Sequence, residues 1–266
     1  MLADMHMHTD FSTDSHAAME DMVKKAIAMH IKTICFTDHI DWDFPEPGVV
    51  FDFDRKKYQQ AIADNREKYK DKLDIRMGVE LGMQPHLEER YNKLLTEYPF
   101  DFAIGSVHLV NNRDPYYKEA FEGRTDKEVF RSYFEGTLEN VKAFHGFDSL
   151  GHLDYVVRYG QNKADDYDWR DYQEIIDEIL KELVKNGKAL EVNSAGLRKK
   201  LGFPNPHPDI IRRYRELGGK MITVGADAHK PEHIGYQFAQ VSELLKACGF
   251  TYYTAFRQRK PEFVRL

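Results

Sequence analysis

The stretch MHMHT, residues 5–9, lies at the end of the first strand-like segment of the chain, which spans residues 2–7. In a β-strand, residues i and i+2 point to the same face, so His6 and His8 could hold one metal ion from one side. Alone, the pair proves little, because 12 histidines in 266 residues give about 0.5 such pairs by chance. Two histidines at the surface or at the edge of the core are the alternative.

Strand-like and helix-like segments alternate along the rest of the chain. The expected strands cover residues 33–37, 75–81, 102–107, 149–152, 189–192 and 221–224. The expected helices cover residues 19–29, 55–69, 127–144, 172–185, 208–217 and 235–247. Pro208 and Asp209 are typical of a helix start, and Asn186 and Gly187 of a helix end. This order predicts an α/β fold with a parallel sheet, and seven such units suggest a barrel, with an open sheet as the alternative.

The composition indicates an ordinary globular protein. Hydrophobic residues make up 42% and charged residues 31% of the chain, which supports a full core, and we expect residues 1–266 to form a single domain. A net charge of -6 argues against a broad nucleic-acid-binding face. We see no signal peptide and no apolar stretch of the ~20 residues that a membrane span needs. Cys35 and Cys248 are expected to be buried and reduced, in a cytoplasmic protein.

Residue types that bind metals stand at the ends of the expected strands. Six of the 12 histidines lie there, which scattered surface histidines would not do so regularly. The carboxyl ends of the strands of a parallel barrel converge on one face, so these side chains should meet. Imidazoles and carboxylates together suit Zn, Mn or Fe. With Asp14 from the loop after the first strand, the candidate ligands are His6, His8, Asp14, His39, Glu80, His108, His152, Asp227 and His229.

These nine candidates are too many for one tetrahedral ion with an open position. Two or three ions that share bridging carboxylates would use them. Glu80 is the natural bridge, because a carboxylate offers two oxygen atoms whereas an imidazole offers a metal one nitrogen.

The pattern of these residues between positions 6 and 229 resembles the PHP (polymerase and histidinol phosphatase) superfamily and, more narrowly, the histidinol-phosphate phosphatases of bacterial histidine biosynthesis. The resemblance implies a distorted (β/α)7 barrel of the TIM-like PHP type and a site for three divalent ions. It assigns His6, His8, Glu80 and Asp227 to one ion, Glu80, His108 and His152 to a second, and Asp14, His39 and His229 to a third. Many relatives carry a histidine at the position of Asp14, so His16 is an alternative ligand.

Two arginines stand near the expected rim of the site. Arg158 and Arg198 each follow a strand end, and a guanidinium group suits a phosphate monoester; surface arginines are the alternative. Phosphate-binding arginines are also what the resemblance implies at these positions. Asp227 or a rim histidine such as His229 could protonate the leaving alkoxide.

Further residues could support the site or the structure around it. Asp38 and Asp154 flank candidate histidines, and each could bond a ring nitrogen or instead form a salt bridge or helix cap. Asn193 and Ser194 could support the loop of Arg198. Loops over residues 42–53 and 111–123 are expected at the rim, where residues 42–44 either wall the substrate pocket or anchor their loop. We expect loop packing for Tyr116, Tyr117 and His233, and a surface position for His30, His86, His145 and His207.

The leading hypothesis for function is metal-dependent hydrolysis of L-histidinol phosphate to L-histidinol and phosphate, within histidine biosynthesis. One alternative is a PHP phosphoesterase that acts on nucleotides or other phosphate esters. Another is a metal-binding regulatory protein without catalysis. The expected partner is a small phosphate ester, with no nucleic acid and no membrane. The sequence is compatible with both a monomer and a homo-oligomer.

Overall fold

The computed structural model describes residues 2–109, 111–162, 165 and 167–266, and its strands form a parallel sheet. The strands are β1 (Ala3–Met7), β2 (Thr33–Phe36), β3 (His39–Ile40), β4 (Asp74–Gly82), β5 (Phe102–Ser106), β6 (Ser149–Leu150), β7 (Ala189–Asn193) and β8 (Ile222–Gly225). Their order is β1-β2-β4-β5-β6-β7-β8, with β3 paired to β4. Every pairing in this sheet is parallel among the described strands.

The two ends of this sheet meet and nearly close it into a barrel. Met7 at the end of β1 pairs with Ala228 just beyond β8. The His8 amide donates to the Ala228 carbonyl at 2.9 Å, and the Asp227 amide donates to the His6 carbonyl at 2.9 Å. The predicted barrel is therefore confirmed, and the open-sheet alternative is wrong.

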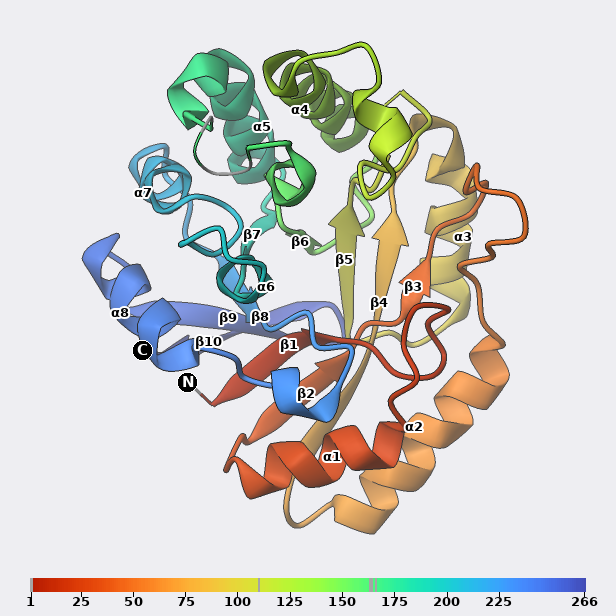
Figure 1. Ribbon diagram of the computed structural model, residues 1–266. Helices are drawn as coiled ribbons and strands as arrows, with labels where there is room; N and C mark the ends of the chain where they lie inside the picture. The colour runs from red at the N-terminus through yellow and green to blue at the C-terminus, as the bar shows by residue number, and fades with distance from the viewer. Residues whose placement is uncertain (1, 110, 163–164, 166) are drawn as a thin grey trace.

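Helices surround the strands (Figure 1). They are α1 (Met19–Ala28), α2 (Arg55–Tyr69), α3 (Glu88–Glu97), α4 (Asp126–Ala143), α5 (Gln173–Lys185), α6 (Ala195–Arg198), α7 (Pro208–Glu216) and α8 (Phe238–Ala247). Short 3-10 helices are η1 (Pro85–Leu87), η2 (Lys118–Phe121), η3 (Tyr155–Tyr159), η5 (Trp169–Tyr172) and η6 (Pro231–His233). In α5, Ile176, Ile179 and Leu183 are buried at helical spacing, so one apolar face packs onto the sheet.

Local signals set several helix ends. Thr125 and the Glu128 side chain form a capping box at the start of α4. Pro208 occupies the first turn of α7, and Gly187 follows α5 with a φ of 61°, which confirms both predicted boundaries. The helix expected over residues 235–247 begins instead at Phe238, because Gly235 and Gln237 have positive φ values of 62° and 53°.

The elements that were not predicted include β3, α3 and α6. An antiparallel hairpin of β9 (Tyr252–Arg257) and β10 (Lys260–Arg265) was not predicted either. The Tyr253 hydroxyl accepts from the Ala3 amide at 3.0 Å, and the Gln258 amide donates to Asp101 at 3.0 Å. Ala3 and Asp101 lie where β1 and β5 begin, so the hairpin covers the amino-terminal end of the barrel, opposite the predicted site.

The buried apolar side chains of the described residues form a continuous core between strands and helices. Cys35 and Cys248 are both buried and unpaired, as expected. Among the described residues, no helix combines the length and the apolarity needed to cross a membrane.

Candidate metal centre

The nine candidate ligands converge at the carboxyl end of the barrel. They belong to different strands of the barrel or to the loops that follow these strands, and Glu80 of β4 lies among them. A cavity of about 480 Å3 opens there. The candidates that line it are Asp14, His39, Glu80, His108, His152, Asp227 and His229, while His6 and His8 lie beneath them with no exposed surface.

The first group of donors consists of His6, His8, Glu80 and Asp227. His6 Nε2 lies 3.1 Å from both Glu80 Oε2 and His8 Nε2. Asp227 Oδ1 lies 3.5 Å from His8 Nε2 and 3.9 Å from His6 Nε2. Ligands of a tetrahedral ion, each about 2.0–2.1 Å from it, lie about 3.3 Å apart. The spacing of these four side chains therefore fits a shared divalent ion.

The second group of donors meets the other oxygen of Glu80. His152 Nε2 lies 2.9 Å and His108 Nε2 lies 3.4 Å from Glu80 Oε1. Ser106 Oγ donates to the same oxygen at 2.6 Å. Because Oε1 and Oε2 face different histidines, the geometry of Glu80 fits the bridging role that the sequence suggested.

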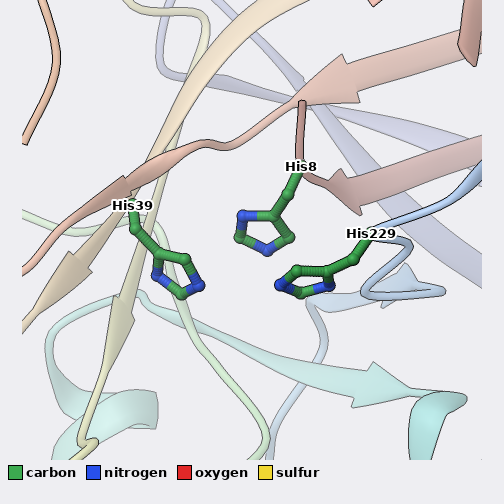
Figure 2. Close-up of side chains that lie close together, drawn as sticks. All are labelled: His8, His39 and His229. Atoms are coloured by element: carbon green, nitrogen blue, oxygen red, sulfur yellow. The ribbon is translucent and has the colours of Figure 1, made fainter. Parts of the chain in front are cut away.

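The third group of donors lies at the mouth of the cavity. Asp14 Oδ2 is 3.0 Å from His229 Nε2 and 3.7 Å from His39 Nε2. Figure 2 shows the rings of His39 and His229 beside that of His8, with ring centroids 4.3 and 4.2 Å from the His8 centroid. Asp14 and His16 are both exposed, but Asp14 contacts His39 and His229, so the geometry favours Asp14 as the ligand.

Burial and the neighbouring charges shift the pKa values of these side chains strongly. Burial alone would raise the pKa of the Glu80 carboxyl, but the neighbouring His6 and His39 outweigh it and hold that pKa well below its ordinary value. Burial also opposes ionisation of Asp227, yet His6, His8 and Arg158 hold its pKa well below the ordinary value. Burial, together with the nearby His229 and His39, lowers the pKa of His8 to about 3. Ionised carboxylates and a neutral imidazole are the forms that bind metals. At His6, His39, His108 and His229 the nearby carboxylates outweigh burial and raise the pKa instead, so an ion that binds there takes the place of ring protons.

Two buried carboxylates orient candidate ligands, and the sequence analysis did not assign them this role. Glu191 Oε1 of β7 lies 2.6 Å from His6 Nδ1, and Oε2 accepts from the His152 amide at 2.8 Å. Asp41 Oδ2 lies 2.5 Å from His108 Nδ1. The contacts with the two Nδ1 atoms turn the Nε2 atoms of His6 and His108 toward the centre. A charged residue inside the buried apolar strand β7 was the available signal for Glu191.

Gly225 allows β8 to approach β1 at this point. A Cβ atom at Gly225 would lie 2.2 Å from His6 Cβ and 2.7 Å from Glu191 Oε1. Any side chain there would displace the ring of His6 or the carboxylate that orients it. The close approach of β8 to β1 at Gly225 therefore helps to hold His6 in place.

Both predicted arginines line the cavity. Arg158 is buried, and its Nη1 donates to Asp227 Oδ2 at 3.1 Å while its Nη2 donates to Asn193 Oδ1 at 3.0 Å. Arg198 is half-buried and donates to the carbonyl oxygens of Ala226 and Asp227 at 3.1 and 3.0 Å. Neither is the surface arginine of the alternative interpretation.

The two flanking aspartates do not bond ring nitrogens among the described residues. Asp38 accepts from the Thr9 amide at 2.6 Å and from Ser12 Oγ at 2.7 Å, and Ser12 Oγ in turn lies 3.1 Å from His8 Nδ1. Asp154 accepts from Asn205 Nδ2 at 2.6 Å. Both aspartates therefore hold loops in place and, within the described part of the chain, do not bond the ligand rings directly. Asn193 supports Arg158.

The loop aromatics divide between the two roles considered for them. Trp42 stacks on Tyr91, with centroids 5.0 Å apart and planes 9° apart, so it anchors its loop. Phe44 lines the cavity, and so do Tyr116, Tyr117 and His233, for which loop packing alone was expected. His30, His86 and His145 are exposed as expected, whereas His207 is half-buried and caps α7.

Comparison with known proteins agrees with this architecture. The model of the PHP domain family matches residues 4–195. The probable histidinol-phosphatase of Clostridium acetobutylicum is 35% identical over 252 residues, 94% of each chain. The histidinol-phosphatase of Lactococcus lactis is 34% identical over 93% of this chain and 91% of its own. A crystal structure of the Lactococcus lactis histidinol phosphate phosphatase, complexed with Zn, L-histidinol and phosphate, matches 98% of each chain at 33% identity with a TM-score of 0.90. The family resemblance is thereby confirmed, and the chain belongs to the PHP domain family.

Proposed function

We propose that this protein hydrolyses L-histidinol phosphate to L-histidinol and phosphate with the aid of bound divalent metal ions. The observation that carries the proposal is the match along 98% of the chain to a structure that holds Zn, L-histidinol and phosphate. The nine donors at the same end of the barrel support it, because they supply the metal-binding groups that such a site requires.

We propose three ions, one for each group of donors. His6, His8, Glu80 and Asp227 would hold the first, Glu80, His108 and His152 the second, and Asp14, His39 and His229 the third. Zn, Mn and Fe all suit imidazole and carboxylate ligands. Bound there, such ions polarise phosphoryl oxygens and lower the pKa of water.

The protein itself would contribute charge and orientation. Arg158 and Arg198 would bind phosphoryl oxygens, because both line the cavity and are held in place by hydrogen bonds before any substrate arrives. Fixed donors of this kind stabilise charge that develops in the transition state. His229, which lines the cavity, is the candidate for protonating the leaving alkoxide, whereas Asp227 is held ionised and has no proton to give.

The test is phosphate release by the purified protein from L-histidinol phosphate, other monoesters and a p-nitrophenyl phosphodiester, before and after chelation. We expect a strong preference for L-histidinol phosphate that chelation abolishes and metal restores. Activity on nucleotides or the diester alone would favour the other PHP phosphoesterases. Full metal occupancy without turnover would favour the non-catalytic alternative.

We further assign the reaction to histidine biosynthesis in the cytoplasm. The names of the relatives support the pathway, and two buried, unpaired cysteines suit a reducing compartment. Expression of the protein in a bacterial strain without histidinol phosphatase should restore growth in the absence of histidine. Failure of the active enzyme to do so would contradict the pathway assignment.

A further inference from the structure

One buried carboxylate in the cavity belongs neither to the donor groups nor to the residues that orient them. Asp114 lies between β5 and α4, lines the cavity and is 9% exposed. Its Oδ1 accepts from the Tyr116 amide at 2.8 Å. Within residues 2–109, 111–162, 165 and 167–266, no lysine, arginine or histidine forms an ion pair with it.

A row of aromatic rings lines the same cavity as this carboxylate. The ring centroids of Tyr116 and Tyr159 are 5.9 Å apart, those of Tyr159 and Tyr155 are 5.1 Å apart, and those of Tyr155 and His108 are 5.5 Å apart. This row leads from the loop around Asp114 to a candidate metal ligand. Burial, with the neighbouring Tyr159 and Asp114, raises the pKa of Tyr155 well above its ordinary value, so the charge of Asp114 acts on the same space.

A buried anion is unfavourable in a cavity that receives a phosphate, unless a cation neutralises it. Burial raises the pKa of the Asp114 carboxyl to about 6, and a neighbouring cation would reverse that shift. A carboxylate among aromatic faces is the chemistry that recognises an ammonium or imidazolium group. The rest of the cavity already provides cations for the phosphate in Arg158 and Arg198.

We propose that Asp114 is the specificity determinant that binds the cationic amino-alkyl part of the phosphate ester, with Tyr155 and Tyr159 forming the walls around it. This inference rests on the proposed function, because L-histidinol phosphate carries an ammonium group on the carbon next to its phosphate-bearing carbon and an imidazole ring beyond it. Asp114 thereby selects esters that are cationic at one end and anionic at the other.

The test compares two small esters of similar shape, phosphoethanolamine and n-propyl phosphate, in which an ammonium group and a methyl group occupy the same place. The wild-type protein should prefer phosphoethanolamine. Asp114→Asn keeps the acceptor for the Tyr116 amide but removes the charge, and a charged hydrogen bond corresponds to about 10- to 100-fold in kcat/KM. We expect the preference for phosphoethanolamine over propyl phosphate, and kcat/KM for L-histidinol phosphate, to fall by that factor.

The matched control is Asp71→Asn, which removes the same charge from an exposed residue between α2 and β4 and should leave the preference unchanged. An unaltered preference in Asp114→Asn would overturn the inference, and so would an equal loss on both esters, which would indicate a role in the chemical step. If the wild-type protein releases no phosphate from L-histidinol phosphate, the proposed function fails. The role of Asp114 is then still decided by the two small esters, and it fails only if their ratio does not change.

Discussion

Replacing Glu191 by glutamine should prevent the candidate ligand His6 from binding a metal, although no ligand residue is itself replaced. The Oε2 atom of Glu191 accepts from the His152 amide at 2.8 Å, and a backbone amide can only donate. The glutamine oxygen must therefore take the place of Oε2. Its NH2 group then takes the place of Oε1, which lies 2.6 Å from His6 Nδ1 in the wild-type protein. His6 Nδ1 must then accept, so the imidazole proton moves to Nε2. That nitrogen faces Glu80 at 3.1 Å and loses the lone pair that a metal needs.

The expected effect is large because the contact is sealed from water. Glu191 is 1% and His6 0% exposed, so no solvent molecule can substitute for the lost acceptor. Loss of a carboxylate that orients a metal-binding histidine typically costs about 10- to 100-fold in metal affinity or activity, or about 1.4–2.8 kcal/mol. We expect the upper half of this range for Glu191→Gln.

The assay measures metal content by mass spectrometry after dialysis against a metal buffer, together with phosphate release from L-histidinol phosphate. Glu97→Gln is the control, since it makes the same chemical change at an exposed residue in α3. Both variants should keep the far-ultraviolet circular dichroism of the wild-type protein. Wild-type metal affinity and wild-type turnover in Glu191→Gln would refute the reasoning about the His6 proton.

Other predictions concern the second orienting contact, the ions and a distant ion pair. Asp41→Asn should lower kcat by about 10- to 100-fold, because Asp41 lies 2.5 Å from His108 Nδ1; unchanged steady-state kinetics would contradict this role. Removing the ions with EDTA should lower the Tm in calorimetry, since a site filled at 100 times its Kd stabilises the fold by about 2.7 kcal/mol, and an unaltered Tm would count against resident metals. Hydrogen bonds from Arg213 at 2.8 and 2.7 Å lower the pKa of Asp177. Asp177→Asn should therefore cost about 1 kcal/mol or less at neutral pH. Because the folded-state pKa is lowered, the contribution is present above the ordinary pKa of about 3.9 and is lost as the pH falls through the folded value. A difference in urea unfolding that persists in strong acid would contradict the ion pair as its origin.

Much of the fold and of the candidate site could be read from local patterns. The alternation of apolar strands with amphipathic helices indicated a parallel α/β barrel, because hydrophobic periodicity depends on backbone geometry within each segment. The candidate ligands could be found for a related reason: parallel strands all present their carboxyl ends on one face. A histidine or carboxylate at each strand end, such as His39 or Glu80, is therefore brought to a common place before any detail of packing is known.

Elements without a clear period escaped this reasoning. The buried residues of α3 are only Tyr91 and Leu94 within its described span, and such a short apolar stripe does not stand out from a loop. The hairpin of β9 and β10 was missed because β10 has no buried residue and therefore no apolar alternation. Its contact with the barrel, such as that of Tyr253 with Ala3, joins opposite ends of the sequence.

By itself, the sequence determined the alternation of the seven barrel strands with helices, because this alternation follows from interactions between neighbours along the chain. It also showed directly which residue types stand at the strand ends. The tertiary structure decided which side chains meet. Asp14 rather than His16 faces His229, Phe44 rather than Trp42 lines the cavity, and Glu191 lies beside His6 although 185 residues separate them. These outcomes depend on the path of the loops and on barrel closure between β1 and β8, and no local spacing encodes contacts that form only when distant strands are packed together.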